Sequence, residues 1–287
     1  MIRNRASALI LLLLSHSVTA QDNPAPGGIV DEPCPPPVIM PDSVRDQLVN
    51  MMIVPRAERQ APARDPGDNP AFGQYIADLN ANADQDWPRL CRFRAANDDL
   101  MARDITPRIV FMGDSITENW LLGDPDLFND NFVNRGISAQ TTPHMLLRFR
   151  NDVIDLNPQI VHILAGTNDV AGNTGPSRPQ DFKNNIMSMV ELARAHGIDV
   201  ILGSIPPAAR FNWSPDMRPA QRIRELNAWM QQYAQDFGIA YIDYFSAMTG
   251  PDGELREELG NDGVHPNRDG YVIMRQLLET QLATMGN

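Results

Sequence analysis

The sequence lacks the motifs of several common kinds of binding site. Its 287 residues contain no His-x-x-x-His or paired-cysteine spacing typical of a metal centre, and no Gly-x-Gly-x-x-Gly or P-loop motif typical of a nucleotide site. Lys183 is the only lysine, and 24 basic against 36 acidic residues give a formal net charge of −12. This deficit of positive charge argues against nucleic acid and anionic membranes as partners. We therefore expect no metal, no other cofactor and no nucleic-acid partner.

Long apolar runs are missing after the first 20 residues, so we expect no transmembrane helix in the rest of the chain. The first 20 residues have the three parts of a secretory signal: a basic start, an apolar core from Ala8 to Leu14, and small residues ending at Ala20. We expect cleavage after Ala20 and a secreted or periplasmic protein. No cysteine follows that point directly, so we expect neither a lipoprotein nor a stable membrane anchor.

Cysteine is scarce, and Cys34 and Cys91 are the only two. In an exported protein an even pair is a candidate disulfide, which would join the N-terminal tail to the body and contribute about 4 kcal/mol by loop closure. Two unpaired thiols are the alternative. Neither cysteine has a histidine close to it in the sequence, so we expect no catalytic or metal-binding role for them.

We divide the chain into three segments: the signal at 1–20, an N-terminal tail and helical extension at 21–104, and a main domain at 105–287. Within the extension, apolar positions recur at helical spacing over 42–54 and again over 73–100. The sequence does not decide whether the extension covers a site on the main domain.

From residue 105 onward, apolar runs rich in β-forming residues alternate with helical patterns. The expected strands are 108–112, 131–134, 159–165, 198–204 and 239–243. The expected helices are about 116–122, 142–155, 180–196, 219–237 and 269–285. This alternation predicts an α/β fold with a parallel, five-stranded sheet that helices cover on both faces.

Four short motifs lie where such a sheet usually binds its ligands. Gly113-Asp-Ser115 ends the first strand, Gly136 the second and Gly166-Thr-Asn168 the third, so all three belong to the carboxyl edge. The fourth, Asp262-Gly-Val-His265, precedes the last helix in a loop that can return to that edge. Each motif alone is explained as an ordinary turn or loop, but their grouping on one edge indicates a functional site.

The residue types in these motifs fit nucleophilic catalysis. Ser115 needs a base, which His265 can supply near neutral pH, and Asp262 can orient the imidazole and stabilise its charged form. The backbone N–H groups of Ser115 and Gly136 and the side-chain amide of Asn168 could bind an oxyanion. We therefore expect a Ser-His-Asp triad with an oxyanion hole of three donors.

Together, the four motifs resemble those of the SGNH, or GDSL-type, serine esterases and acylhydrolases. The resemblance covers about residues 105–285, makes 105–287 the catalytic domain, and implies the same roles for Ser115, His265, Asp262, Gly136 and Asn168. The layout is also similar to the catalytic subunits of platelet-activating-factor acetylhydrolase, which implies a flavodoxin-like, three-layer α/β/α sandwich. The Gly-x-Ser-x-Gly elbow of α/β-hydrolases is absent.

The expected function is that of a secreted serine esterase that cleaves acetyl or short-chain acyl esters through an acyl-enzyme, on small acyl esters, acetylated glycans or lipid-like substrates. Four side chains near the edge are candidate substrate contacts, although ordinary packing explains them equally well: Trp120, Arg210, Phe211 and Trp213. An O-acetyltransferase with the same triad and a non-catalytic carbohydrate-binding protein are the alternatives. The sequence leaves the oligomeric state open.

Overall fold

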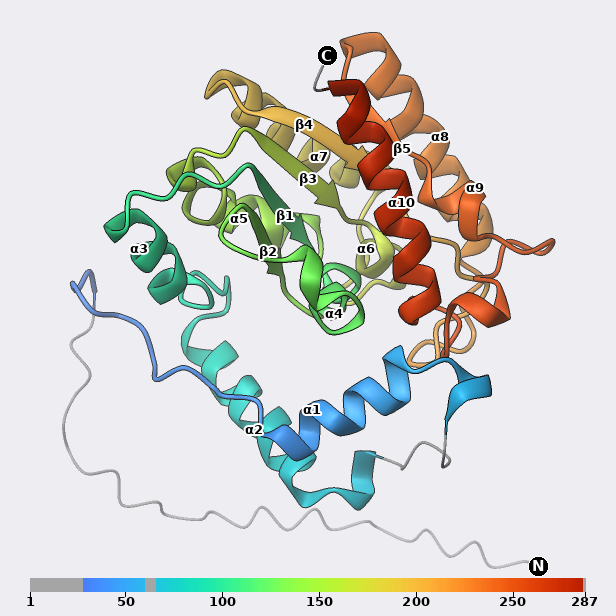
Figure 1. The fold of residues 1–287 in the computed structure, drawn as a ribbon, viewed down its shortest axis with the longest axis horizontal. Coiled ribbons are helices and arrows are strands. Elements are labelled where there is room, and N and C mark those ends of the chain that lie inside the picture. Colours follow the sequence, from blue (N-terminus) through green and yellow to red (C-terminus); the bar gives the residue numbers. More distant parts are fainter. Residues whose placement is uncertain (1–27, 60–65, 286–287) are drawn as a thin grey trace, which may run out of the picture. The chain divides into compact units, whose positions relative to one another are not determined.

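The computed structural model describes residues 28–59 and 66–285, so the expected signal at 1–20 lies outside the described residues. From Cys34 onward the chain forms one compact unit (Figure 1). Among the described residues, no helix has both the length and the apolar character needed to cross a membrane.

A five-stranded sheet in which every strand is parallel to its neighbours lies at the centre of this unit. Its strands are β1 (Ile109–Gly113), β2 (Phe132–Gly136), β3 (Ile160–Leu164), β4 (Asp199–Gly203) and β5 (Ala240–Ile242). The order across the sheet is β2-β1-β3-β4-β5, which is the flavodoxin-like order with its switch point between β1 and β3. The predicted α/β fold with five parallel strands is confirmed.

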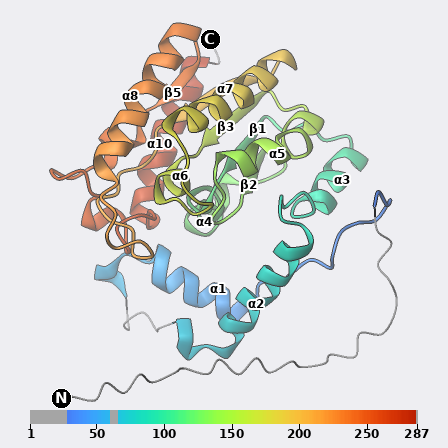
Figure 2. The same cartoon turned by 180° about the vertical axis from the view of Figure 1, so that it is seen from behind.

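Helices cover both faces of the sheet, because successive strand residues point to opposite sides and both sides are apolar. Val110 and Met112 face one core, which α5 (Thr142–Asp152), α7 (Pro179–Ala195) and α8 (Ala220–Phe237) close. Ile109 and Phe111 face the other core, which α4 (Ser115–Gly123), α9 (Tyr244–Met248) and α10 (Arg268–Met285) close. Figures 1 and 2 show these two layers from opposite sides.

Several shorter elements lie between the longer helices and strands. The helix α6 (Thr167–Ala171) follows β3 directly. Single 3-10 turns lie at Arg56–Glu58, Pro66–Asp68, Pro125–Leu127, Ile154–Leu156 and Glu257–Leu259.

The N-terminal extension, residues 34–102, contains three helices. They are α1 (Asp42–Leu48), which continues into a π-helical turn at Val49–Ile53, then α2 (Pro70–Gln85) and α3 (Arg94–Ala102). The helical stretch expected over 73–100 is therefore interrupted. The carboxylate of Asp86 accepts hydrogen bonds from the backbone N–H groups of Leu90 and Cys91, and this local cap replaces the helical hydrogen bonds there.

The extension is held to the main domain at two places. Ile53 belongs to the core under α10, and Leu100 belongs to the core under α5. Cys34 and Cys91 form a disulfide with a Cα–Cα distance of 5.5 Å, which ties the start of the extension to the segment between α2 and α3. The helices of the extension are therefore fixed parts of the same unit as the sheet.

Candidate active site

The turn between β1 and α4 places Ser115 at the carboxyl edge of the sheet. Gly113 ends the strand where a Cβ atom would collide with Thr117, so the chain can turn this tightly only with glycine there. Asp114 caps α4 by accepting a hydrogen bond from Ile116 N at 2.9 Å. Ser115 is consequently the first residue of the helix, where its backbone N–H has no partner within the helix.

Ser115, His265 and Asp262 form a continuous chain of hydrogen bonds. Ser115 Oγ lies 2.8 Å from His265 Nε2, and His265 Nδ1 lies 2.7 Å from Asp262 Oδ2. The other carboxylate oxygen of Asp262 accepts hydrogen bonds from the backbone N–H groups of Val264 and His265, which fixes the loop. The three predicted side chains thus come together although Ser115 and His265 are 150 residues apart in the sequence.

The electrostatics of these three hydrogen-bonded side chains favour an ionised aspartate beside the imidazole. Burial disfavours charge on Asp262, but hydrogen bonds from His265 outweigh it and lower the pKa of that carboxyl below its ordinary value. Burial also disfavours the imidazolium, yet the hydrogen bond and charge of Asp262, with the charge of Asp114, raise the pKa of His265 above its ordinary value. Only 13% of the His265 side chain is exposed.

Asn168 is brought to the same edge by α6, directly after β3. Its side chain is buried, and Nδ2 donates to Gln140 O at 3.0 Å and, over a longer distance of 3.3 Å, to Asp114 Oδ2. Its Oδ1 accepts from Asn173 Nδ2 at 2.6 Å, which fixes the orientation of the amide. Burial raises the pKa of Asp114 to about 7. Asn168 therefore presents its amide group beside the turn that carries Ser115.

Gly136 does not take the place expected for it. Its N–H donates to Asn134 Oδ1 at 2.9 Å, and a Cβ atom there would collide with the backbone of Thr117 and Glu118. The glycine is thus explained by close packing of β2 against α4 and lies away from the pocket described below. This corrects the assignment of its N–H as an oxyanion donor.

Ala139, three residues after Gly136, lies at the pocket instead. It lines the pocket together with Ser115 and Asn168, and its φ of +66° turns the backbone in a way that L-residues rarely adopt. Among the described residues its N–H donates to no other group. The predicted donors lie in motifs that contain glycine, and no glycine marks this left-handed position, so the motifs do not point to Ala139.

Of the four candidate substrate contacts, the structure places one at the pocket. Trp120 is fully buried and stacks on Tyr271 in the core, so it does not reach the site. Phe211 is also fully buried, beneath Trp213. Arg210 is exposed but does not line the pocket. Trp213 does line it: 46% of this residue is exposed, its ring centroid lies 6.4 Å from that of His265, and its Nε1 donates to Asn173.

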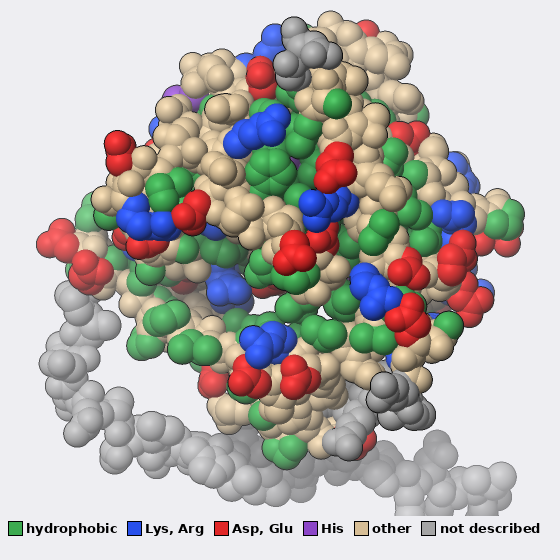
Figure 3. Space-filling view, in the orientation of Figure 1, with side chains coloured by type: hydrophobic (Ala, Val, Ile, Leu, Met, Phe, Trp, Pro, Cys, Tyr) green, Lys and Arg blue, Asp and Glu red, His purple; other side chains and the backbone are tan. Residues whose placement is uncertain are grey.

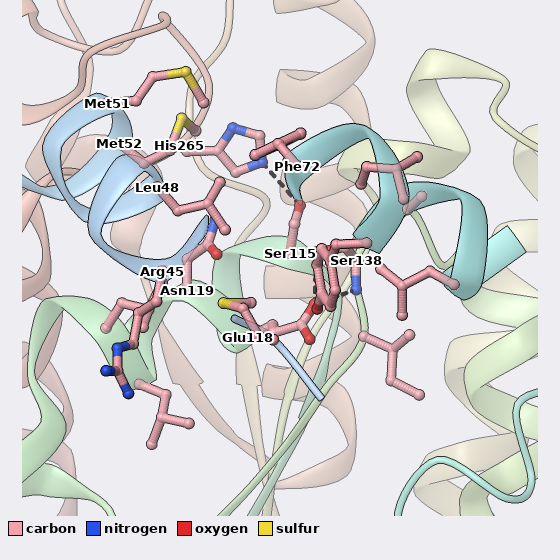
Figure 4. Close-up of a pocket in the computed structure, with 18 of the residues that line it drawn as sticks. Arg45, Leu48, Met51, Met52, Phe72, Ser115, Glu118, Asn119, Ser138 and His265 are labelled. Carbon is pink, nitrogen blue, oxygen red and sulfur yellow. Dashed lines mark hydrogen bonds between the residues drawn. The ribbon is translucent and has the colours of Figure 1, made fainter. Parts of the chain in front are cut away.

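A cavity of about 660 Å³ opens beside Ser115 and His265. One wall comes from the main domain, and the opposite wall comes from the N-terminal extension, through α1, its π-turn and α2 (Figure 4). In the space-filling view, hydrophobic side chains border much of the hollow between the extension and the main domain, together with some Lys or Arg side chains (Figure 3). The question that the sequence left open is thereby answered, because the extension covers this edge of the sheet.

Within 28–59 and 66–285 the structure contains no group of three or more His, Cys, Asp or Glu side chains arranged to hold a metal ion. The other buried histidine, His162, donates to or accepts from Tyr244 Oη at 2.9 Å, and burial lowers its pKa to about 3. It is a neutral core residue far from a ligand set.

Comparison with known proteins identifies the class. The model of the GDSL-like lipase/acylhydrolase family matches residues 111–273, and the chain belongs to this family. It is therefore an SGNH-type serine hydrolase. Two solved structures are similar to it: a candidate acylhydrolase from Bacteroides fragilis NCTC 9343 (42% identity, TM-score 0.66) and a GDSL-like lipase from Bacteroides thetaiotaomicron VPI-5482 (41% identity, TM-score 0.65). Each alignment covers 69% of this chain and 98% of the other.

A curated relative is also similar over a shorter stretch. The uncharacterized lipoprotein YqeF of Bacillus subtilis (strain 168) is 35% identical over 122 residues. That stretch is 36% of this chain and 50% of YqeF, so the match spans half the length of that relative. The residues that the family model matches include all four motifs.

Proposed function

We propose that the protein is an exported serine esterase that hydrolyses acyl esters through an acyl-enzyme formed on Ser115. The observation that carries the proposal is the 2.8 Å contact between Ser115 Oγ and His265 Nε2, with Asp262 on the far side of the imidazole. This arrangement leaves Nδ1–H as the donor to Asp262 and Nε2 free to accept the serine proton.

The first half of the reaction forms the acyl-enzyme. His265 Nε2 takes the proton of Ser115 Oγ while Oγ attacks the ester carbonyl carbon, and the carbonyl oxygen becomes an oxyanion. When the carbonyl re-forms, the C–O bond to the alcohol breaks, and the imidazolium of His265 gives its proton to the departing alkoxide. Asp262 stabilises the imidazolium during these steps without taking its proton.

The second half releases the acid. His265 Nε2 takes a proton from a water molecule, whose oxygen attacks the acyl carbon. The bond to Ser115 Oγ then breaks, and the proton returns to the serine. The same groups serve both halves, so no further side chain is needed.

The oxyanion would receive hydrogen bonds from three donors. These are the N–H of Ser115, the Nδ2 of Asn168 and, in place of Gly136, the N–H of Ala139. The pocket lining supports this set, since it contains all three residues, and the contact from Asn168 to Asp114 is long enough to be exchanged for one to the oxyanion. Each such donor typically contributes about 3 kcal/mol to the transition state.

Export and substrate belong to the proposal as well. The disulfide between Cys34 and Cys91 is of a kind that persists in oxidising compartments, which supports the signal expected at 1–20. Acetyl or short-chain acyl esters, on small molecules or glycans, are the substrates that the sequence favours. Of the four candidate contacts that would serve a glycan, Trp213 alone lines the pocket.

The test is hydrolysis of p-nitrophenyl acetate, butyrate and octanoate by the wild type, Ser115→Ala and the control Ser177→Ala, whose serine is exposed and away from the pocket. We expect turnover to fall by more than about a thousandfold in Ser115→Ala and to stay unchanged in the control. Equal turnover in all three proteins would overturn the role of Ser115. A folded wild type that cleaves none of these esters would instead support a transferase or a binding protein.

A further inference from the structure

The cavity beside Ser115 is lined mainly by apolar side chains, of which Met52 and Leu122 also pack against the core under α10. On the extension these include Leu48, Met51, Met52 and Phe72, and none of them is fully buried. Figure 4 shows them on α1, its π-turn and α2, across the cavity from Ser115 and Glu118. Methionine is flexible and adapts to apolar ligands of varied shape. The wall is thus suited to an apolar occupant.

Large apolar side chains also remain exposed at this cavity. Ile76 is 39% exposed and Leu121 is 47% exposed, one on the extension and the other on α4, and both line the same space. Apolar side chains that gather around a hollow without packing partners usually mark a binding site. A cavity of about 660 Å³ is within the range of ligand pockets and is far larger than an acetyl group needs.

The charged side chains that line the cavity already have partners, and Arg45 pairs with Asp42 outside it. Arg92 Nη2 lies 3.2 Å from Glu118 Oε1, and the other oxygen of Glu118 accepts from Ser138 N and Oγ. Arg89 donates to the backbone carbonyl of Leu79. Because these charged groups already have partners within the protein, they offer little to a charged occupant. The arrangement therefore favours a hydrocarbon chain.

The wall is tied directly to the loop that carries His265. Asn261, next to Asp262 in the sequence, donates through Nδ2 to the backbone carbonyls of Met52 and Val54 at 2.9 Å each. Arg59 donates to the carbonyl of Met51 at 2.6 Å. In these hydrogen bonds, backbone carbonyls of the π-turn at Val49–Ile53 and of Val54 just after it are the acceptors. An irregular turn of this kind is frequent at functional sites.

From these observations we propose that the N-terminal extension forms the acyl-chain pocket of the enzyme, and that the preferred substrates are esters of medium- and long-chain carboxylic acids. The proposal rests on the serine esterase function proposed above. The acyl chain is the occupant because it stays bonded to Ser115 through both halves of the reaction. The alcohol must leave, and water must enter before deacylation. An apolar wall beside Ser115 suits the part that remains.

The experiment measures kcat/KM for p-nitrophenyl acetate, butyrate, octanoate and dodecanoate with the wild type and Leu48→Gln. The matched control is Leu147→Gln, the same substitution at an exposed leucine of α5 outside the cavity. We expect kcat/KM of the wild type to rise with chain length. Leu48→Gln should lower kcat/KM for octanoate and dodecanoate by about tenfold, with acetate changed less than about twofold.

A second variant keeps the proposal testable if Leu48→Gln fails to fold. Leu79→Trp adds volume to the cavity wall and should reduce dodecanoate turnover while acetate turnover is kept. Hexyl and octyl acetates, compared with ethyl acetate, show whether the cavity binds the alcohol instead. A chain-length effect confined to these alkyl acetates would overturn the proposal.

Failure of this proposal differs from failure of the esterase function. Acetate turnover that depends on Ser115 but exceeds octanoate turnover would sink the acyl-chain pocket and leave the esterase intact. An equal loss on every ester in Leu48→Gln would also sink it, because it would mean a structural role for the wall. If the folded wild type showed no hydrolysis that depends on Ser115, both the acyl-chain pocket and the esterase function would be wrong.

Discussion

Asp262 Oδ2 lies 2.7 Å from His265 Nδ1, and this contact determines how the imidazole titrates. Burial would lower the pKa of His265, but the hydrogen bond and charge of Asp262 raise it above the ordinary 6.5. The base must be neutral to accept a proton. We therefore expect kcat/KM of the wild type to rise with pH through a pKa above 6.5.

Asp262→Asn tests this relationship. Without the negative charge of Asp262, burial is opposed by the smaller effect of Asp114, so the pKa of His265 falls and the rising limb of the pH profile moves to lower pH. The plateau should fall by about three to four powers of ten, since the imidazolium loses its stabilising partner. Asp269→Asn, at an exposed aspartate in the first turn of α10, serves as the control. A limb that stays in place in Asp262→Asn would contradict the assignment.

Asn168→Ala tests the side-chain donor of the oxyanion hole. The amide would act mainly on the transition state, so kcat should fall about a hundredfold or more while KM changes little. Asn184→Ala, on the exposed side of α7, should leave both constants unchanged. If the loss appeared in KM alone, the amide would be a ground-state binding group and not an oxyanion donor.

Ala139→Gly tests the left-handed backbone position. An L-residue at a φ of +66° is strained by about 1–2 kcal/mol, and glycine removes that strain at some entropic cost in the unfolded chain. We expect the free energy of unfolding to increase by about 1 kcal/mol. Turnover should persist because glycine keeps the N–H. Ala139→Val should have the opposite effect on stability, and equal denaturation midpoints for all three proteins would argue against strain here.

The sheet and its edge could be predicted because both depend on local patterns. Apolar runs fix the strands, and the carboxyl ends of parallel strands necessarily meet at one edge, so Ser115 and Asn168 could be placed together. The same reasoning did not place Trp120, which was a candidate substrate contact and is buried in the core. At about 100° per residue, Asn119 and Leu122 share the face of Ser115 on α4, whereas Trp120 points about 140° away. Applying the helical period to α4 would have identified Asn119 as a pocket residue and Trp120 as core.

Other parts of the site depend on contacts that no local pattern reports. The helical spacing over 42–54 predicts an apolar face, and the sequence holds no signal that this face lies opposite Ser115. That placement comes from Ile53 in the core and from the bonds between Asn261 and the π-turn. The prediction for Gly136 is wrong for a related reason. The sequence alone does not distinguish a glycine required by close packing against α4 from a glycine that supplies an oxyanion donor.

Arg148 is a buried positioning residue between two parts of the site. Its Nη2 donates to Gly113 O at 3.1 Å, at the end of β1, and its Nε donates to Gln140 Oε1 at 2.6 Å. Its charge is balanced by Asp152, 2.9 Å away, and the two side chains are 0% and 2% exposed. The backbone carbonyl of Gln140 in turn holds Asn168.

Arg148→Met should therefore lower the free energy of unfolding by about 3–5 kcal/mol, because the carboxylate of Asp152 is left buried without its partner. Arg150→Met on the same helix is the control: its side chain is 58% exposed, and it should change stability by less than about 0.5 kcal/mol. The double variant Arg148→Met/Asp152→Leu should recover part of the loss. Equal denaturation midpoints in urea for Arg148→Met and Arg150→Met would show that the buried pair is not needed for stability.

The disulfide between Cys34 and Cys91 gives the last prediction, because it closes a segment that contains α1 and α2 and hence the proposed acyl wall. The two cysteines are 57 residues apart in the sequence, and closing a loop of that length contributes up to about 4 kcal/mol. In Cys34→Ser/Cys91→Ser we expect faster proteolysis within residues 34–102 than within the sheet. The ratio of octanoate to acetate turnover should fall as the wall loosens. Leu100 and Ile53 still anchor the extension in the two cores, so acetate turnover should persist. An unchanged octanoate-to-acetate ratio in a variant that is cleaved faster in the extension would separate the wall from acyl-chain selection.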